Sequence, residues 1–417
     1  MNILLFEDSG VEKLFPITTG RPAYAIHCAG FRLIDRLKAM NRPIVSWVRP
    51  YLESIQLQDF DFLASELNPE HDETLILNSR LAPTKANLNA IQRMVESTSD
   101  RGFVQRSDWA VAAAKIRTAD ILNQPNLKQQ DWIEGLVNQP KIEVLESELS
   151  IFQYPHDVVA INMSSFQENI EAKIRLGVFS EIKVGVFVGS DVQISQSAHF
   201  DSEDGPIVIE SGTRIGPFTF FRGPVFIGAN CKVSEHASIK DAVSISHTCK
   251  IGGEIESTVF EAWSNKQHHG FLGHSYVGSW VNLGAGTCNS DLKNTYGKVN
   301  MVYGNGKIPT KMQFMGCAVG DYAKTAINTS IFTGKTIGTA AMVYGFATTN
   351  VPSFTNYART FDKMGELPPE IVEITQKRMF QRRKVEQRPC DIQLLRDMYR
   401  VTAGERPAGL SREPISL

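Results

Sequence analysis

Two adjacent histidines, His268 and His269, are the residues of this chain whose type best suits proton transfer. An imidazole titrates near neutral pH, so it can accept a proton from a reacting group and return it later. The pair is followed by three small residues, Gly284, Ala285 and Gly286, which permit a bound molecule to approach the backbone closely. The alternatives are polar loop residues for the histidines and ordinary corner residues for the glycines.

Arginine side chains supply candidate phosphate ligands, because a guanidinium grips phosphate through two parallel hydrogen bonds. Arg21 follows Gly20 in a turn-rich segment, and Arg32 lies on the helix expected after it. We expect these two arginines to flank a phosphate site at the carboxyl ends of the first strands, where open α/β sheets bind ligands. Surface arginines paired with local carboxylates are the alternative.

The chain ends in a basic stretch that includes Lys377, Arg378, Arg382, Arg383, Lys384 and Arg388. It is expected within one or two helices over residues 368–400. Such a run is more often a solvated helix face, but it could also reach the phosphates of a cofactor.

The histidines lie within a segment, residues 182–343, in which apolar residues recur every six positions. Apolar residues stand at Ile182, Val188, Ile194, Phe200, Ile209, Ile215, Phe221, Ile227, Val233, Ile239, Ile245, Ile251, Val277, Leu283, Val319, Ile331, Ile337 and Val343. Only Thr325 departs from the apolar type. A hexapeptide repeat predicts a solenoid of short parallel strands with the repeat side chain pointing inward. A glycine often follows the repeat position, and we expect it at corners with φ > 0.

Two stretches depart from this count, residues 257–276 and residues 287–316. The first carries both histidines. Loops that leave a rigid stack are long, lie on the surface and often carry function. We therefore expect the functional residues of the solenoid near these two stretches.

The chain before the repeats alternates short strands, expected at 3–6, 44–48 and 74–77, with helices expected at 24–40 and 87–95. This alternation predicts an α/β domain with a mainly parallel sheet. A helix expected at 164–176 leads into the solenoid. The predicted domains are an α/β domain over 1–175, a solenoid over 176–350 and a helical extension over 351–417.

Composition excludes several classes of function. A net charge of -2 gives no global field that would attract nucleic acid or an acidic membrane. The sequence has no apolar run long enough to span a bilayer and no secretion signal. The six cysteines are scattered without a CxxC motif, which favours reduced thiols and a cytoplasmic location.

The stretch HHGFLGHSYVGSWVNLGAGTCNSD resembles the acetyltransferase half of the GlmU-like bifunctional family. The pieces FPITTGRPAYAIHCAGFRLIDRL and LILNSRLAPT resemble a divergent sugar-nucleotidyltransferase domain. The resemblance implies an N-terminal nucleotidyltransferase-like domain followed by a left-handed parallel β-helix. It also implies transfer of an acyl group, chiefly acetyl from acetyl-CoA, to an amino-sugar phosphate, and nucleotidyl transfer from UTP or dTTP to a sugar 1-phosphate with Mg²⁺. The family makes UDP-N-acetylglucosamine in the cytoplasm and forms homotrimers with sites between subunits.

The resemblance assigns roles to individual residues of the solenoid. His268 matches the catalytic base, and Arg222 matches an arginine that holds the sugar phosphate. Asn282 and Asn289 match substrate-site asparagines, although an asparagine ladder inside the coil is the alternative. Gly284, Ala285 and Gly286 lie along the acetyl-CoA groove.

Two departures from the family pattern put the acceptor in doubt. Phe271 replaces a phosphate-binding tyrosine, and a phenyl ring cannot make that hydrogen bond. The family's second phosphate-binding lysine maps near Thr258, so Lys266, Lys293 or Lys298 would have to supply the charge.

The N-terminal domain departs further from its relatives. It lacks their glycine-rich phosphate loop after the first strand, and Asn78 stands where a metal-binding aspartate is expected. Asp108 is another possible carboxylate. The alternatives are therefore a nucleotidyltransferase whose β-helix is regulatory or oligomerising, and a non-catalytic sugar-nucleotide-binding scaffold.

Overall fold

The computed structural model describes residues 1–97, 103–107, 110–123, 133, 143–146, 149–304, 306–413 and 415. Its contacts divide the chain into two compact units. The first unit contains residues 1–14, 21–26 and 31–153, and the second contains residues 15–20, 27–30 and 154–417. Asp108 lies outside the described residues.

The first unit is built on a six-stranded sheet in the order β2-β1-β3-β5-β4-β6. The strands are β1 (Asn2–Phe6), β2 (Ile44–Trp47), β3 (Glu73–Asn78), β4 (Phe103–Ser107), β5 (Ala110–Arg117) and β6 (Glu143–Glu146). Strand β1 runs parallel to β2 and β3, whereas β5 is antiparallel to β3 and β4. The expected α/β sheet is therefore mixed: β2-β1-β3 and β4-β6 are parallel, and β5 runs antiparallel between them.

The helices of this unit differ in length from those that the sequence suggested: the helix expected over 87–95 is confirmed and slightly longer, whereas the one expected over 24–40 is much shorter. They are α1 (Leu33–Lys38), α2 (Glu53–Asp59), α3 (Lys85–Glu96) and α4 (Thr118–Leu122), with 3₁₀ turns at Ser9–Leu14, Ala23–Ala25 and Pro50–Leu52. The helix expected over 24–40 is only six residues long. Residues 27–30 belong to the second unit by their contacts, so the chain cannot continue as one helix across them.

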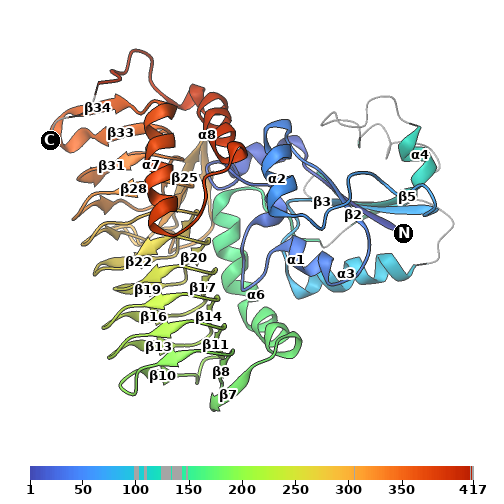
Figure 1. Ribbon diagram of the computed structural model, residues 1–417, viewed down its shortest axis with the longest axis horizontal. Helices are drawn as coiled ribbons and strands as arrows, with labels where there is room; N and C mark the ends of the chain where they lie inside the picture. The colour runs from blue at the N-terminus through green and yellow to red at the C-terminus, as the bar shows by residue number, and fades with distance from the viewer. Residues whose placement is uncertain are drawn as a thin grey trace. The chain divides into compact units, whose positions relative to one another are not determined.

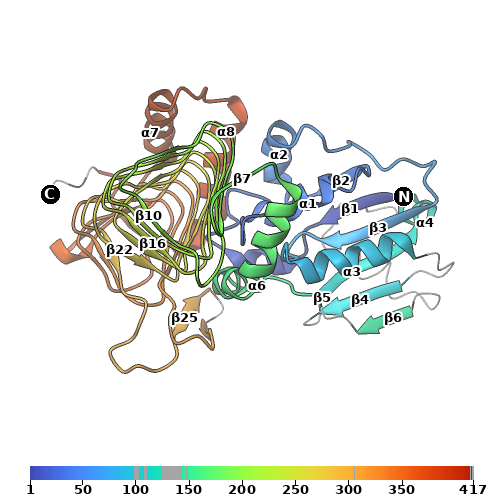
Figure 2. The same ribbon diagram turned by 90° about the horizontal axis from the view of Figure 1, so that it is seen from below.

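The second unit is a parallel β-solenoid preceded by the long helix α6 (Pro155–Leu176) (Figure 1). Seen from below, its coils stack one behind another around a narrow core (Figure 2). One face holds β7 (Ser180–Lys183), β8 (Val186–Val188), β11 (Ile207–Ile209), β14 (Val225–Ile227), β17 (Val243–Ile245), β20 (Val259–Phe260), β23 (Tyr276–Val277), β27 (Cys317–Val319) and β30 (Lys335–Ile337). All neighbours on this face are parallel except β7, which is antiparallel to β8.

The other two faces are built from similar short parallel strands. The second face holds β9 (Gln193–Ile194), β12 (Arg214–Ile215), β15 (Lys232–Val233), β18 (Lys250–Ile251), β21 (Asn265–Lys266), β28 (Lys324–Thr325), β31 (Met342–Val343) and β33 (Thr355–Ala358), with β34 (Lys363–Glu366) antiparallel at its end. The third holds β10 (His199–Asp201), β13 (Phe220–Arg222), β16 (Ser238–Lys240), β19 (Glu254–Glu256), β22 (Phe271–Gly273), β24 (Cys288–Asn289), β29 (Ser330–Ile331) and β32 (Phe346–Ala347). The repeat-position side chains form one continuous core through the stack.

Glycines after the repeat position serve a different purpose from the one expected. They are absent from the positions with positive φ, which are held instead by residues such as Asn230, Trp263 and Trp280. A Cβ on Gly216 would lie 2.7 Å from the backbone nitrogen of Glu235 in the next coil. The glycine is therefore required by the close approach of successive coils and not by its own backbone angles.

Three parts of the repeat differ from the expectation. Ile182 is half exposed on the edge strand β7 and does not enter the core. The stretch 257–276 stays in the stack and contributes β20, β21 and β22, because its corners are shorter and Lys266 occupies a repeat position. Thr325 is buried at its repeat position, where its hydroxyl lies 2.7 Å from that of Thr287.

The sequence indicated an excursion over 287–316; in the structure Cys288–Asn289 stays in the stack as β24, and the excursion runs over 290–316. It carries the hairpin of β25 (Asn300–Tyr303) and β26 (Gly306–Pro309). After the last coil, the helices α7 (Pro369–Arg382) and α8 (Pro389–Val401) complete the unit. Figure 1 shows both in red at the C-terminal end of the stack. Among the described residues, no helix is long and apolar enough to cross a membrane.

Candidate active site

A pocket of about 490 Å³ lies on the second unit, between the second face of the solenoid and α7. It is lined by Lys250, Trp263, Asn265, Gln267, His268, Trp280, Asn282, Leu283, Gly284, Ala285, Lys324, Ile327, Met379, Arg382 and Arg383. Six residues named in the sequence analysis therefore meet in one cavity: His268, Asn282, Gly284, Ala285, Arg382 and Arg383. Its volume is typical of small-molecule sites.

One wall of the pocket is a polar ladder on successive coils. Lys250 pairs in register with Asn265, Asn265 with Asn282, and Asn282 with Lys324. The parallel register places these four side chains one above another on the outer surface. Asn282 is exposed at the pocket, so it does not belong to a ladder inside the coil. The Arg383 guanidinium donates to the Asn265 side-chain oxygen at 2.7 Å, which ties α7 to this wall.

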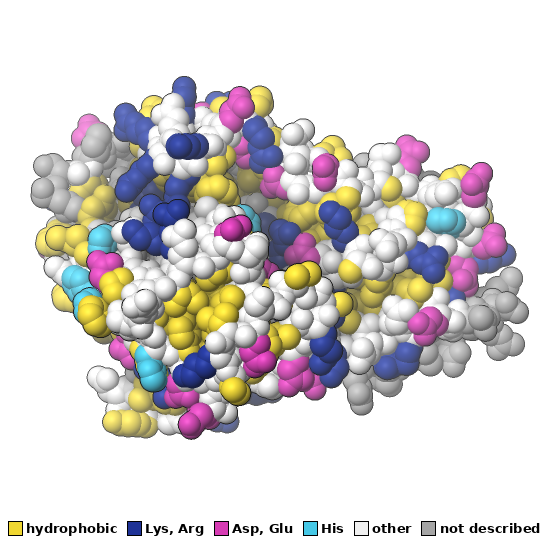
Figure 3. All heavy atoms as spheres, turned by 60° about the horizontal axis from the view of Figure 1, so that its bottom comes forward, with side chains coloured by type: hydrophobic (Ala, Val, Ile, Leu, Met, Phe, Trp, Pro, Cys, Tyr) yellow, Lys and Arg dark blue, Asp and Glu magenta, His cyan; other side chains and the backbone are white. Residues whose placement is uncertain are grey.

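The pocket is strongly cationic. Lys250, Lys324, Arg382 and Arg383 line it, and no carboxylate does so in the part of the chain that the structure describes. None of these four cations forms an ion pair with a described residue. Figure 3 shows lysine and arginine side chains gathered around α7, at the upper left of that view. An uncompensated cluster of this kind favours an anionic ligand.

Burial, and for Lys250 and Arg383 also the repulsion of neighbouring charges, lowers the pKa values of three of these cations. Burial lowers the pKa of Lys324 to about 8, and its ammonium donates to the Tyr322 carbonyl at 2.9 Å. Burial and then the charge of Arg383 lower the pKa of Lys250. Bound phosphate would stabilise the protonated forms of both lysines, so ligand binding and protonation are coupled here.

The other wall is aromatic. Trp263 and Trp280 stack with ring centroids 4.8 Å apart and an interplanar angle of 4°. Phe380 of α7 packs on Trp280 at 4.4 Å, which holds the helix against the solenoid. The pocket therefore offers apolar surface beside its charges.

His268 lies at the pocket rim, in the loop between β21 and β22, and its side chain is exposed. The backbone carbonyls of this loop accept hydrogen bonds from Lys266 and from Gly286. The Lys266 ammonium donates to the carbonyl oxygens of His268 at 2.6 Å and His269 at 3.0 Å. The Gly286 amide donates to the same His269 carbonyl at 3.0 Å. Gly286 thus supports the histidine loop, while Gly284 and Ala285 face the pocket.

Lys266 differs most from its sequence-based role. Its side chain is fully buried at a repeat position, in register with Ile251. Its ammonium faces two backbone carbonyls and does not line the pocket. Burial lowers its pKa to about 8. This placement gives Lys266 no contact with a phosphate in the pocket.

Arg222 and Lys293 lie outside the pocket. The Arg222 guanidinium pairs with the Asp241 carboxylate through Nε at 2.9 Å and through a second, shorter contact. This hydrogen-bonded pair raises the pKa of Arg222. Lys293 lies in the excursion 290–316, as does Lys298. One chain alone does not bring these cations to His268.

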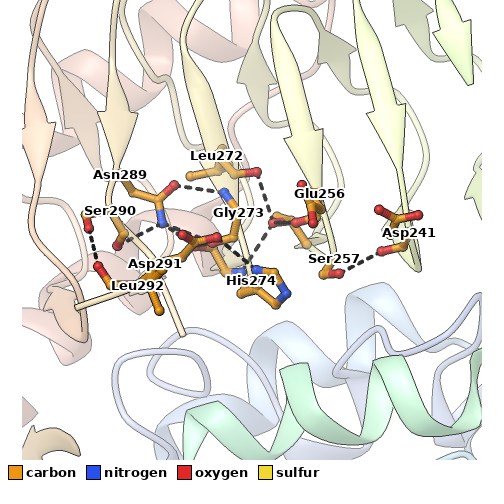
Figure 4. A network of polar contacts seen from close by, with 12 residues as sticks. Asp241, Glu256, Ser257, Leu272, Gly273, His274, Asn289, Ser290, Asp291 and Leu292 are labelled. Carbon is orange, nitrogen blue, oxygen red and sulfur yellow. Dashed lines mark hydrogen bonds and ion pairs between the residues drawn. The ribbon is translucent and has the colours of Figure 1, made fainter. Parts of the chain in front are cut away.

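Asn289 is buried and fully engaged with the preceding coil (Figure 4). Its oxygen accepts from the Gly273 amide at 2.8 Å, and its nitrogen donates to the Gly273 carbonyl at 3.0 Å. This is the ladder arrangement that the sequence left as an alternative.

A second histidine, His274, was missed by the sequence reading. Its Nδ1 lies 2.9 Å from the Asp291 carboxylate (Figure 4). The ring stacks on that of Phe314, with the ring centroids 5.2 Å apart. Asp291 lies in the adjacent excursion, so the pairing is invisible from spacing alone. The pair joins the start of the excursion to the coil below, and it does not line the pocket.

In the first unit, the ends of the parallel strands carry charged residues that neutralise one another. Glu7 binds Arg49 at 2.9 Å, with both side chains buried. Asp8 binds Arg80 through two hydrogen bonds of 2.8 and 2.6 Å. These are the charges at the expected ligand edge, and the sequence reading did not select them.

The arginines predicted there have local partners. Arg32 pairs with Asp35 on the first turn of α1 at 2.7 Å, which is the surface alternative. The backbone carbonyl of Arg21 accepts from Arg49 at 2.9 Å.

The strand-end residues do not fit a magnesium ion in this arrangement. Asp8 is occupied by Arg80, and the Asn78 side chain donates to Asp8 at 2.9 Å and accepts from the Arg80 amide at 2.9 Å. Among the described residues, no three metal-binding side chains form a cluster. We therefore derive no chemical step through Mg²⁺.

Comparison with known proteins gives a match for each half of the chain. Residues 3–175 match the family model described as sugar nucleotidyl transferase. The bifunctional protein GlmU of Thermotoga maritima is 30% identical over 207 residues, which cover 45% of this chain and 41% of that protein. A bifunctional sugar-1-phosphate nucleotidylyltransferase/acetyltransferase of Sulfurisphaera tokodaii is 28% identical over 390 residues, covering 81% of this chain and 94% of that protein.

Among solved structures, the acetyltransferase domain of PglB from Neisseria gonorrhoeae in complex with acetyl coenzyme A aligns with a TM-score of 0.19 and 12% identity. That alignment covers 49% of this chain and 64% of the PglB chain. The chain spans less than half the length of the GlmU proteins that it matches. The sequence matches confirm the expected resemblance: the chain is similar to bifunctional proteins of the GlmU type, with a sugar nucleotidyl transferase-type domain ahead of a parallel β-solenoid.

Proposed function

We propose that the solenoid transfers an acyl group, acetyl in the simplest case, from acyl-CoA to the amine of an amino-sugar phosphate. One observation carries the proposal: a histidine lies at the rim of a pocket that combines four cations with an aromatic wall and lacks any lining carboxylate among the described residues. CoA is itself an anion with several phosphates and an aromatic base. Its chemistry therefore complements both walls.

His268 acts as the base in this reaction. The amine nitrogen attacks the thioester carbonyl and gives up one proton to the imidazole as the carbon–nitrogen bond forms. The tetrahedral intermediate then expels the CoA thiolate, which takes that proton from the imidazolium, so the ring returns to its starting state. The Lys324, Arg382 and Arg383 cations bind phosphates and take no part in proton transfer.

The test compares two adjacent histidines. His268→Ala should slow acetyl transfer by about 10²–10⁴-fold while leaving the affinity for acetyl-CoA unchanged. His269→Ala is the matched control, because His269 is also exposed but does not line the pocket. Products are identified by mass after incubation with acetyl-CoA and a panel of amino-sugar phosphates. A His268→Ala protein that keeps the wild-type rate would remove His268 from the mechanism.

The second part of the proposal concerns Arg222 and the acceptor. We propose that Arg222 binds the acceptor phosphate, as its counterpart does in the resembling family, and that the Asp241 pair opens to allow it. Arg222→Ala should then weaken phosphorylated acceptors more than unphosphorylated ones. Equal losses for both would show that Arg222 has only its structural pairing with Asp241.

The first unit supports a second candidate function, nucleotidyl transfer, because residues 3–175 match a sugar nucleotidyl transferase model. The paired strand-end charges argue for weak nucleotide binding instead. The full chain is incubated with Mg²⁺, UTP or dTTP and sugar 1-phosphates, and pyrophosphate release is measured. Turnover supports a bifunctional enzyme, whereas binding without turnover supports a domain that only holds a sugar nucleotide.

We also propose a homotrimer, which the resemblance implies and which would bring side chains of different subunits to one site. Sedimentation at micromolar concentration measures it. A monomer under these conditions would contradict the shared-site arrangement.

A further inference from the structure

Lys266 occupies a core position of the solenoid, where burial of a charged side chain is unfavourable for the free energy of folding. It is fully buried, and its neighbours in register are Ile251 on one side and the coil of Leu283 on the other. Elsewhere in this core the repeat position holds mainly isoleucine and valine. Lysine is almost never fully buried unless its ammonium finds partners, because loss of hydration destabilises the charge.

The partners of this ammonium are two backbone carbonyls of the histidine loop. The Nζ atom donates to His268 at 2.6 Å and to His269 at 3.0 Å. No described carboxylate forms an ion pair with it. Lys266 therefore binds the main chain of the loop, including the carbonyl of His268, the proposed base.

The surrounding glycines show that the loop is closed tightly onto this lysine. A Cβ on Gly270 would lie 2.2 Å from the Thr287 carbonyl and 3.2 Å from Lys266 Nζ. A Cβ on Gly253 would lie 2.9 Å from the His268 carbonyl. The Gly286 amide also donates to the His269 carbonyl. These close contacts leave the backbone of the loop little room to move.

An aliphatic side chain would fill the same core position without desolvating a charge, but it would leave the His268 carbonyl without this donor. The amine therefore serves the loop backbone more than the packing of the coil. We propose that Lys266 is a positioning residue that fixes the His268 backbone from inside the solenoid, so that the imidazole stays at the pocket rim. This inference rests on the proposed role of His268 as the base.

Its effect on catalysis follows from geometry. A reacting group that is displaced by about 1 Å loses rate by roughly 10²-fold, even when substrate still binds. Lys266 does not line the pocket, so its loss should leave binding of acyl-CoA intact. A lowered kcat at unchanged KM for acetyl-CoA is the expected signature.

The experiment uses the full chain with Lys266→Met, which keeps the length of the side chain and removes the ammonium. We expect a modestly lowered melting temperature, because the His268 carbonyl loses its donor, with kcat lowered by about 10- to 100-fold and an unchanged Kd for acetyl-CoA. The Cε1–H NMR signal of the His268 ring, assigned with His268→Ala, should broaden or split. Lys232→Met is the matched control, because Lys232 lies on the same face two coils away and is exposed. It should change none of these quantities.

The outcomes separate this inference from the proposed function. A Lys266→Met protein with wild-type kcat and an unchanged His268 signal would overturn the positioning role. If the ring signal changes but neither protein transfers an acyl group, the positioning role stands and the proposed function fails. Should Lys266→Met not fold, Lys266→Gln is measured in the same way. Failure of both to fold would show that the lysine is needed by the coil itself, and this also overturns the inference.

Discussion

Charged side chains gather both at the strand ends of the first unit (Glu7, Asp8, Arg49 and Arg80) and in the pocket of the second unit. They are paired with opposite charges in the first group and, among the residues that the structure describes, lack acidic partners in the second group. In the first, Glu7 neutralises Arg49 and Asp8 neutralises Arg80. In the second, Lys250, Lys324, Arg382 and Arg383 have no acid partner among the described residues. A ligand phosphate would have to break an existing pair in the first place, whereas it would relieve repulsion in the second.

This difference teaches that a basic side chain at a ligand edge is not in itself a ligand site. The free energy of binding depends on what the cation contacts beforehand. By this criterion, the cations of the pocket beside α7 favour binding of an anion, whereas the ion pairs at the strand ends of the first unit stabilise the fold.

The largest effect that would test the comparison concerns Asp8. Asp8→Asn removes the charge that neutralises the buried Arg80, so the first unit should lose about 3 kcal/mol of stability. Hydrogen exchange of β1 and β3 amides in the full chain measures this locally. Asp35→Asn is the control, because the exposed Arg32–Asp35 pair contributes at most about 1 kcal/mol. Equal, small losses for both variants would make the strand-end charges available to a ligand and remove the contrast.

The next effect concerns α7. Changing Arg382 and Arg383 together to Gln should weaken acetyl-CoA binding by about 10- to 100-fold, because each removes one charge-assisted contact with phosphate. Calorimetry measures the Kd. Arg378→Gln, on the same helix but away from the pocket, should leave it unchanged. A similar loss with Arg378→Gln would point to a diffuse field over the helix in place of a defined site.

The smallest effect is a pH dependence. Burial lowers the pKa of Lys324 to about 8, so its positive charge is present below that pH and is lost as the pH rises through it. Affinity for acetyl-CoA should therefore fall a few-fold between about pH 7.5 and about pH 9.5. Lys324→Met should bind more weakly at the lower pH and show a flatter profile. An equally steep profile in the variant would assign the titration to another group.

The sequence predicted the solenoid because eight successive repeat positions, from Ile209 to Ile251, follow one spacing. It misplaced the stretch after Ile251, because the corners there are shorter and Lys266 breaks the apolar pattern at a core position. The pattern of residue types records which side chains face inward only while those positions stay apolar.

The site could be predicted only in part. His268, Asn282, Gly284 and Ala285 were found through their resemblance to a family, and the structure places all four in the pocket. The contribution of α7 depends on Phe380 packing against Trp280, a contact between residues a hundred positions apart. The sequence offered the basic stretch with Arg382 and Arg383 as a possible phosphate contact, but the packing that brings it to the pocket has no local signal. The pairing of Asp8 with Arg80 is hidden for the same reason.

The stacked Trp263–Trp280 pair has a consequence for measurement. Two parallel indoles with centroids 4.8 Å apart share their electronic excitation, and both border the pocket. A molecule that enters beside them changes their environment and so changes the emission and near-ultraviolet dichroism of the protein. The chain therefore carries its own optical reporter, and candidate ligands can be screened by light before any reaction product is known.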